Sequence, residues 1–245
     1  MKLFYHIGRY FLLMSHVFSK PDKYRVFYKQ TIREIESLGI DSIGIVTIIS
    51  VFMGAIITIQ TAYNTDNPLY PSYLIGLTVR DTLLLEFSST IIALILAGKI
   101  GSNIASEIGT MRITEQIDAL EALAIDPLRY LALPRILSGF VMVPVLTIFA
   151  DFVGIMGAYV VAYLNLDLPP EIFFGSVKEF FTIMNVMSGL IKAFVFGGVT
   201  AIIGCHVGFN TEGGAEGVGK ATIRAFVLSS ALILLNDYLL SVILF

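Results

Sequence analysis

Charged residues are scarce in this sequence of 245 residues. They make up 14% of the chain, against roughly 25% in soluble domains, while hydrophobic residues make up 56%. Cysteine is nearly absent: the one copy, Cys205, lies inside an apolar run, which excludes a disulfide framework within the chain. The composition therefore indicates an integral membrane protein, in which Cys205 is a small buried apolar residue.

Motifs for catalysis, metal binding and nucleotide binding are also missing. The three histidines are scattered, at His6, His16 and His206. They form no recognisable metal site with the cysteine, and neither G-x-S-x-G nor H-E-x-x-H occurs. Residues 214–221 nearly match the phosphate loop G-x-x-x-x-G-K-[ST], but Ala221 stands where a hydroxyl residue would hold magnesium, and a predicted membrane helix precedes the run instead of a strand. We therefore expect a chain that is not an enzyme and binds no cofactor or metal.

Five apolar runs are long enough to cross a bilayer, which takes a helix of about 20 residues. They cover approximately residues 43–65, 74–105, 134–166, 183–209 and 223–245. Pro144 lies inside the third run and predicts a tilt or a kink there. The predicted fold is an all-α integral membrane protein whose five-span domain occupies residues 39–245.

A basic amphipathic segment, residues 1–38, precedes the first run. Its apolar residues recur at helical spacing, and Pro21 divides it into two pieces. Such helices lie in the headgroup plane with their basic residues toward anionic lipid, so we favour an interfacial arm. The alternative is an ordinary cytosolic helix packed on the protein.

Basic residues are distributed unevenly between the two sides of these runs. Thirteen of the sixteen lie in the arm or in the loops after the second and fourth runs, at Lys2, Arg9, Lys20, Lys23, Arg25, Lys29, Arg33, Lys99, Arg112, Arg129, Arg135, Lys220 and Arg224. The positive-inside rule places the N-terminus and both loops in the cytoplasm and the C-terminus outside, in the periplasm of a Gram-negative cell. The basic residues form no patch of the kind that binds nucleic acid, and no such partner is expected.

The loop at residues 106–133, between the second and third runs, is the most polar long segment after residue 40. Apolar residues recur along one face of a short helix within it, at Ile113, Ile117, Leu120 and Ala124. The pair Asp126-Pro127 ends this helix, because proline disfavours a helical residue before it. A short amphipathic helix held between two spans is typical of a docking element.

Four charged residues lie within the predicted spans, at Glu86, Asp151, Lys192 and Asp237. A charge at the centre of a bilayer costs at least about 2.5 kcal/mol, so it normally faces a partner or a wet cavity. Asp151 and Lys192 fall near the centres of their spans and are candidates for an intramembrane pair. Glu86 and Asp237 lie toward the outer half, where they are candidates either for lining a substrate cavity or for helix packing.

The segment that contains the docking helix carries a family resemblance. Residues 107–120 read Glu-Ile-Gly-Thr-Met-Arg-Ile-Thr-Glu-Gln-Ile-Asp-Ala-Leu, followed by Asp-Pro at 126–127 and by Tyr-Leu-x-x-Pro-Arg at 130–135. This pattern closely resembles the signature of the MlaE-type permease family, the membrane subunits of ABC transporters that move phospholipids between the two membranes of Gram-negative bacteria and in chloroplasts. The similarity extends through residues 52–54, 97–102 and 213–222, and covers roughly residues 40–245.

The resemblance implies a permease in the bacterial inner membrane that moves phospholipid between inner and outer membranes and so supports outer-membrane lipid asymmetry. Implied partners are a second permease copy, a cytoplasmic ABC ATPase dimer that binds ATP and magnesium, and a periplasmic ring of MCE-domain subunits. The helix after Gly109 would be the coupling helix, with its apolar stripe seated in a groove of the ATPase. The implied coupling residues are Glu107, Arg112, Thr114, Glu115, Gln116, Asp118, Glu121 and Asp126.

The resemblance also implies a lipid cavity between the two copies, lined by spans one, two and five. Its candidate residues are Gln60, Glu86 and Asp237. The family commonly shows Arg-Glu-Leu-Gly-Pro around the glutamate, whereas residues 85–89 here read Leu-Glu-Phe-Ser-Ser, without the basic residue and the Gly-Pro kink. Two other classes stay open: a stand-alone secondary transporter or channel, which internal repeats would favour, and a membrane-embedded lipid enzyme, which a metal or nucleophile motif would favour.

Overall fold

The computed structural model describes residues 24–65, 71 and 73–244. Most of the predicted arm, residues 1–23, lies outside the described residues, as do residues 66–70, 72 and 245. Every regular element in the described part is a helix, and five helical stretches are long and apolar enough to cross a membrane. These are Phe27–Asn64, Tyr73–Ile113, Leu128–Leu166, Ile183–Phe209 and Gly214–Leu244. The prediction of an all-α membrane protein with five spans is confirmed.

Several of these stretches change helical type along their length. The first consists of α2 (Tyr24–Gly39), the 3₁₀ turn η1 (Ile40–Ser42) and α3 (Ile43–Asn64). The second consists of α4 (Tyr73–Thr82), the π-helix η2 (Leu83–Ile91), α5 (Ile92–Leu96), the π-helix η3 (Ala97–Gly101) and α6 (Ser102–Ile113). The third joins the π-helix η4 (Leu128–Ala132) to α8 (Leu133–Leu166), which continues as one helix through Pro144. The fourth and fifth are α10 (Ile183–Phe209) and α11 (Gly214–Leu244).

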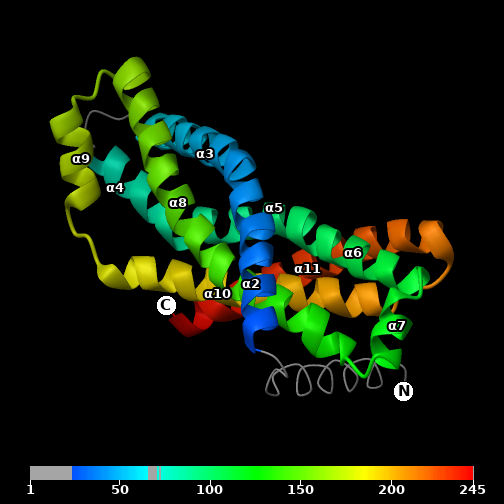
Figure 1. Ribbon diagram of the computed structural model, residues 1–245. Helices are drawn as coiled ribbons and strands as arrows, with labels where there is room; N and C mark the ends of the chain where they lie inside the picture. The colour runs from blue at the N-terminus through cyan, green and yellow to red at the C-terminus, as the bar shows by residue number, and fades with distance from the viewer. Residues whose placement is uncertain (1–23, 66–70, 72, 245) are drawn as a thin grey trace.

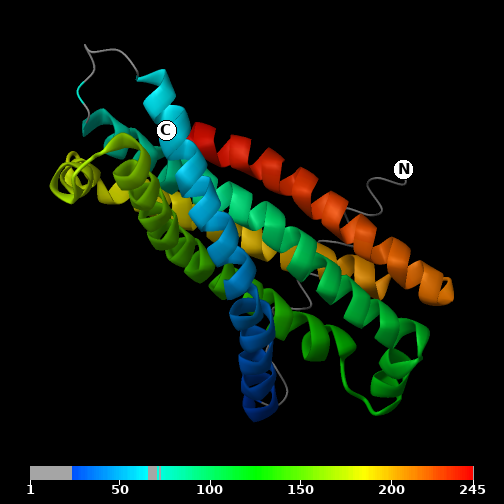
Figure 2. The same cartoon turned by 90° about the horizontal axis from the view of Figure 1, so that it is seen from above.

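Two short helices mark opposite ends of the bundle (Figure 1). The helix α7 (Gln116–Ala122) lies at one end, close to the turn between α10 and α11, and α9 (Pro170–Lys178) lies at the other. Between these ends α3 packs on α8, and α10 packs against α8, α6 and α11. Figure 2 shows that α2 runs on into α3 across the bundle, and that α11 lies along the upper edge of the bundle in this view. We call the two ends the α7 end and the α9 end.

The described part of the predicted arm is the helix α2, which packs along α8. The hydroxyl of Ser138 on α8 donates a hydrogen bond to the Thr31 carbonyl at 3.2 Å, and Leu38 is buried. This contact agrees with the alternative of a helix packed on the protein. The position of α2 relative to lipid headgroups stays a prediction.

Small residues allow the main helix pair, α3 and α8, to approach backbone to backbone. A Cβ atom built on Gly54 would overlap the carbonyl oxygen of Gly154, and one on Gly157 would lie 2.6 Å from the Val51 carbonyl oxygen. Lipid tails are as apolar as the helices, so close packing of this kind is a main source of helix association in a membrane.

We predict that Gly54→Ala destabilises the fold by about 1–3 kcal/mol, because the added methyl group forces α3 away from α8. The matched control is Gly44→Ala on the same helix, where a Cβ would meet no atom within 4 Å. Unfolding in detergent can be followed with a thiol-reactive dye, since Cys205 is the one cysteine and is buried. Equal stability of the two variants would contradict the prediction.

Candidate functional site

The predicted coupling segment forms a sharp helical turn at the α7 end. Glu115 has a φ of 59°, a left-handed conformation that is uncommon outside glycine, and it turns the chain from α6 into α7. Arg112 on α6 donates from Nη1 to Asp118 Oδ1 on α7 at 2.7 Å, which ties the two helices together. The Thr114 hydroxyl accepts a hydrogen bond from Gln116 Nε2 at 3.1 Å and so links the turn itself to α7.

The apolar face of α7 packs on the chain's own bundle, and its polar face is exposed. Ile117 is buried, and Leu120 packs against the same hydrophobic core, so these two residues of the predicted stripe face the bundle of their own chain. The other two do not belong to α7: Ile113 ends α6, and Ala124 lies beyond α7 and is exposed. The expectation that this stripe seats in a partner's groove is therefore wrong: the nearest apolar surface is the chain's own core. The face turned away from the bundle carries exposed Asp118 and Glu121, and Leu123 at the end of α7 is 71% exposed.

Two of the predicted coupling residues lie at the base of this segment. Asp126 Oδ1 accepts a hydrogen bond from the Leu128 amide at 3.0 Å, and Arg129 Nε lies 3.1 Å from Asp126 Oδ2. Glu107 on α6 instead contacts Arg135 on α8. Asp126 therefore orders the turn into η4, while Glu107 ties α6 to α8.

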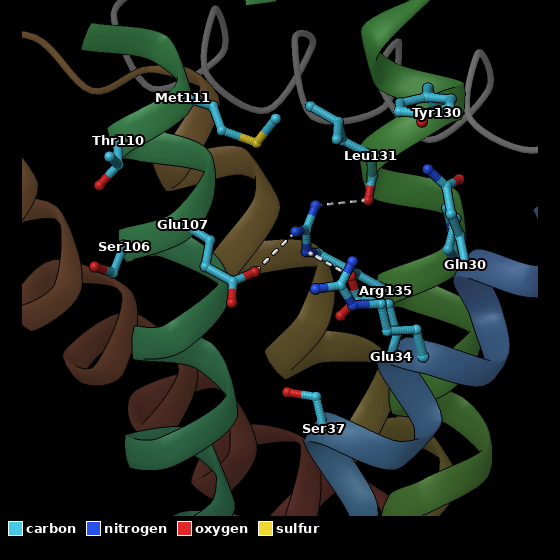
Figure 3. Close-up of a pocket in the computed structure, with 12 residues that line it drawn as sticks. Gln30, Glu34, Ser37, Ser106, Glu107, Thr110, Met111, Tyr130, Leu131 and Arg135 are labelled. Atoms are coloured by element: carbon cyan, nitrogen blue, oxygen red, sulfur yellow. Dashed lines mark hydrogen bonds and ion pairs between the residues drawn. The ribbon is translucent and has the colours of Figure 1, made fainter. Parts of the chain in front are cut away.

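Arg135 joins three helices beside a cavity of about 580 Å³ (Figure 3). The buried guanidinium donates from Nη2 to Glu107 Oε2 at 2.8 Å and from Nη1 to the Leu131 carbonyl at 3.1 Å. Its Nε lies 3.4 Å from Glu34 Oε1 on α2. The guanidinium of Arg135 therefore connects α2, α6 and α8.

A second ionic cluster lies within the membrane-spanning part of the bundle, where η2, α10 and α11 meet. Lys192 on α10 has no exposed side-chain area, and its Nζ lies 2.7 Å from Glu86 Oε1 and 3.0 Å from Asp237 Oδ1. The same ammonium donates to the Leu85 carbonyl at 3.3 Å, and the Ser241 hydroxyl lies 3.3 Å from Glu86 Oε1. We call these three charged residues the Lys192 cluster.

The predicted pair of Asp151 with Lys192 is wrong. Asp151 lies on α8, where its carboxylate faces the Ser88 hydroxyl of η2. Lys192 is directed instead toward η2 and α11, which bring two other carboxylates to it. Hydropathy places a charge at a depth in the membrane but does not determine the helix that it faces.

The backbone at Glu86 is π-helical in the stretch where the family commonly has its Gly-Pro kink. The wide turn leaves carbonyls free for side chains: Lys192 donates to the Leu85 carbonyl, and the Ser89 hydroxyl donates to the Glu86 carbonyl at 3.3 Å. Single π turns are frequent at functional sites. Among the described residues, the third cavity candidate, Gln60, is exposed on α3 and makes none of the contacts of the Lys192 cluster.

Arg80 on α4 is a buried cation that the sequence analysis missed. It is 2% exposed and donates from Nε to Asp81 Oδ1 at 2.9 Å and from Nη1 to the Val177 and Glu179 carbonyls at 2.9 and 2.5 Å. Asn185 on α10 donates to the same Asp81 oxygen at 3.3 Å. This clamp ties α4, α9 and α10 together at the α9 end; adjacent Arg and Asp residues at the start of an apolar run were its sequence signal.

No group of three or more histidine, cysteine, aspartate or glutamate side chains in the described stretches could hold a metal ion. The glycine-rich run begins the helix α11 and follows the helix α10, with Gly213 and Gly214 in left-handed conformations. A phosphate loop requires a strand before the glycine-rich run, whereas here a helix precedes it.

Comparison with known proteins gives a consistent result. A family model described as "Permease MlaE" matches residues 31–243. A probable ABC transporter permease protein of Rickettsia prowazekii is 36% identical over 96% of this chain and 89% of its own length, and one of Synechocystis is 37% identical over the same shares. The chloroplast protein TRIGALACTOSYLDIACYLGLYCEROL 1 of Arabidopsis thaliana is 32% identical over 89% of this chain and 62% of its own length.

We predict that Lys192→Met lowers the free energy of unfolding by about 3 kcal/mol, because two carboxylates lose their buried counter-charge. Labelling of Cys205 with a thiol-reactive dye during denaturation in detergent measures the change. Lys178→Met, at an exposed lysine on α9, is the matched control and should leave stability unchanged. Wild-type stability of the Lys192 variant would show that the cluster does not hold the helices together.

Proposed function

Because this chain belongs to the MlaE family of ABC transporter permeases, we propose that it is the membrane subunit of a transporter that moves phospholipid between the inner and outer membranes of a bacterium. The energy comes from a separate ATPase subunit, which binds ATP and magnesium. The chain is a multi-pass membrane protein. The name of its chloroplast relative refers to a glycerolipid, which supports a lipid as the transported molecule.

The observation that carries this proposal is the Lys192 cluster. Glu86 keeps 45% of its side chain exposed although it lies within a membrane span and contacts a fully buried lysine. A charged group in such a place normally marks a substrate path or a wet cavity. A phospholipid headgroup is a polar group that must pass through apolar surroundings, and the cluster supplies polar contacts at that depth.

The apolar surfaces beside the cluster suit the acyl chains of the same molecule and a second permease copy. On α3 and α11, large apolar side chains are exposed at Ile56, Ile59, Tyr63, Leu235, Tyr238 and Val242. Exposed apolar side chains of this kind on a membrane protein contact lipid or another subunit. We assign these two helices to the walls of a cavity shared by two copies.

The outward face of α7 is the proposed contact with the ATPase. Basic residues gather at the α7 end, which supports a cytoplasmic position for this end and a periplasmic position for the α9 end and the C-terminus, where a ring of MCE-domain subunits would receive lipid. Movement of α7 passes to α6 through the Arg112–Asp118 pair and then to α2 and α8 through Arg135. The continuous helix from α6 to η2 carries it to Glu86.

We predict that Glu121→Lys reduces co-purification of the ATPase by about tenfold, because a reversed charge faces the partner across the interface. Glu121 is preferred over Asp118, since Asp118 also pairs with Arg112 within the chain. The measurement is the ratio of ATPase to permease after affinity purification, together with ATPase stimulation. Glu171→Lys, at an exposed acid on α9, should leave both unchanged.

If Glu121→Lys assembled and stimulated the ATPase like the wild type, α7 would not be the coupling helix.

A further inference from the structure

The ammonium group of Lys192 donates hydrogen bonds to Glu86 Oε1 and the Leu85 carbonyl and forms an ion pair with Asp237. A lysine ammonium carries three N–H donors and no acceptor. Three oxygens surround it in the structure: Glu86 Oε1 at 2.7 Å, Asp237 Oδ1 at 3.0 Å and the Leu85 carbonyl at 3.3 Å. Because the side chain is fully buried among these oxygens, a phosphate group has no path to this lysine.

The other buried cation on the α9 side of the bundle is occupied as well. Arg80 is 2% exposed, and its guanidinium contacts Asp81 and two carbonyl groups at the end of α9. The residue before Glu86 is the apolar Leu85, which carries no charge. An anionic headgroup that reached the cluster would therefore meet no available cation from Lys192, Arg80 or position 85.

The cluster carries more negative than positive charge. One lysine faces two carboxylates, so one negative charge is left without a partner within the cluster when both acids are ionised. Glu86 is the more exposed of the two, at 45% against 17% for Asp237, and the Ser241 hydroxyl lies beside it. The accessible surface of the site is thus acidic, and in apolar surroundings an unpaired carboxylate strongly favours a cationic partner.

We propose that the Lys192 cluster selects phospholipids whose headgroup carries an ammonium group, such as phosphatidylethanolamine, over phospholipids with an anionic headgroup, such as phosphatidylglycerol. The ammonium group contacts Glu86 and supplies the missing positive charge. This specificity rests on the proposed function, since it concerns the headgroup that the same cavity would hold.

The test uses the complete transporter, with its ATPase and lipid-binding ring, reconstituted in vesicles of equal parts phosphatidylethanolamine and phosphatidylglycerol. The complex is repurified, and its bound phospholipid is extracted and quantified by mass spectrometry. We expect the wild type to be enriched about 1.5-fold to fivefold in phosphatidylethanolamine, the range for a partly exposed ion pair. ATP-dependent transfer of each labelled lipid is measured on the same preparations.

Three variants define the source of the enrichment. Glu86→Gln keeps the shape of the site but makes it neutral, so the bound ratio should fall to that of the vesicle. Leu85→Arg introduces a cation at the position where the family commonly has one and should shift the ratio toward phosphatidylglycerol. Glu171→Gln, at an exposed acid on α9, is the matched control and should retain the wild-type ratio.

The outcomes separate the two proposals. A wild-type ratio equal to that of the vesicle, or an unchanged ratio in Glu86→Gln, with ATP-dependent transfer intact, would overturn the headgroup specificity and leave the lipid permease standing. Absence of both bound phospholipid and transfer in the wild type would overturn the proposed function itself. If Leu85→Arg fails to assemble, the Glu86→Gln ratio decides.

Discussion

A fully buried lysine within an apolar bundle is the constraint on which the arrangement of the spans depends. Lys192 cannot be solvated where it lies, so η2 and α11 must both bring carboxylates to α10. This requirement fixes the rotation of three helices that hydropathy alone would leave undetermined. It also places the π-helical turn at Glu86, where a free carbonyl completes the coordination of the ammonium group.

Two other buried cations repeat this device at the ends of the bundle. Arg135 joins α2, α6 and α8 beside the coupling segment, and the pair Arg80–Asp81 joins α4, α9 and α10 at the α9 end. Each junction holds three elements around one buried cation, and helices run between the junctions without interruption. A rigid connection of this kind is suited to carry a displacement from α7 to the interior of the membrane.

The all-α fold and its five spans followed from composition and run length, because a bilayer demands long apolar helices. The partners of individual side chains did not follow. Asp151 and Lys192 share a depth, but the pairing depends on helix rotation, which only tertiary packing determines. The predicted stripe was correct only for Ile117 and Leu120: the left-handed Glu115 separates Ile113 on α6 from α7, and Ala124 lies beyond the end of α7. The burial of Arg80 was not predicted, because a charged residue at the boundary of a span is normally exposed to water or headgroups.

The central claim is that phospholipid occupies the site beside the Lys192 cluster under control of the ATPase. Photo-crosslinking tests this most directly. A benzophenone residue is placed at position 238, next to Asp237, or at position 152 on α8, where the native Tyr238 and Phe152 are 70% and 64% exposed. The account predicts that labelled phosphatidylethanolamine crosslinks to position 238 in the complete transporter in a manner that changes with ATP, while position 152 reports surrounding lipid independently of nucleotide. Equal, nucleotide-independent crosslinking at both positions would contradict it.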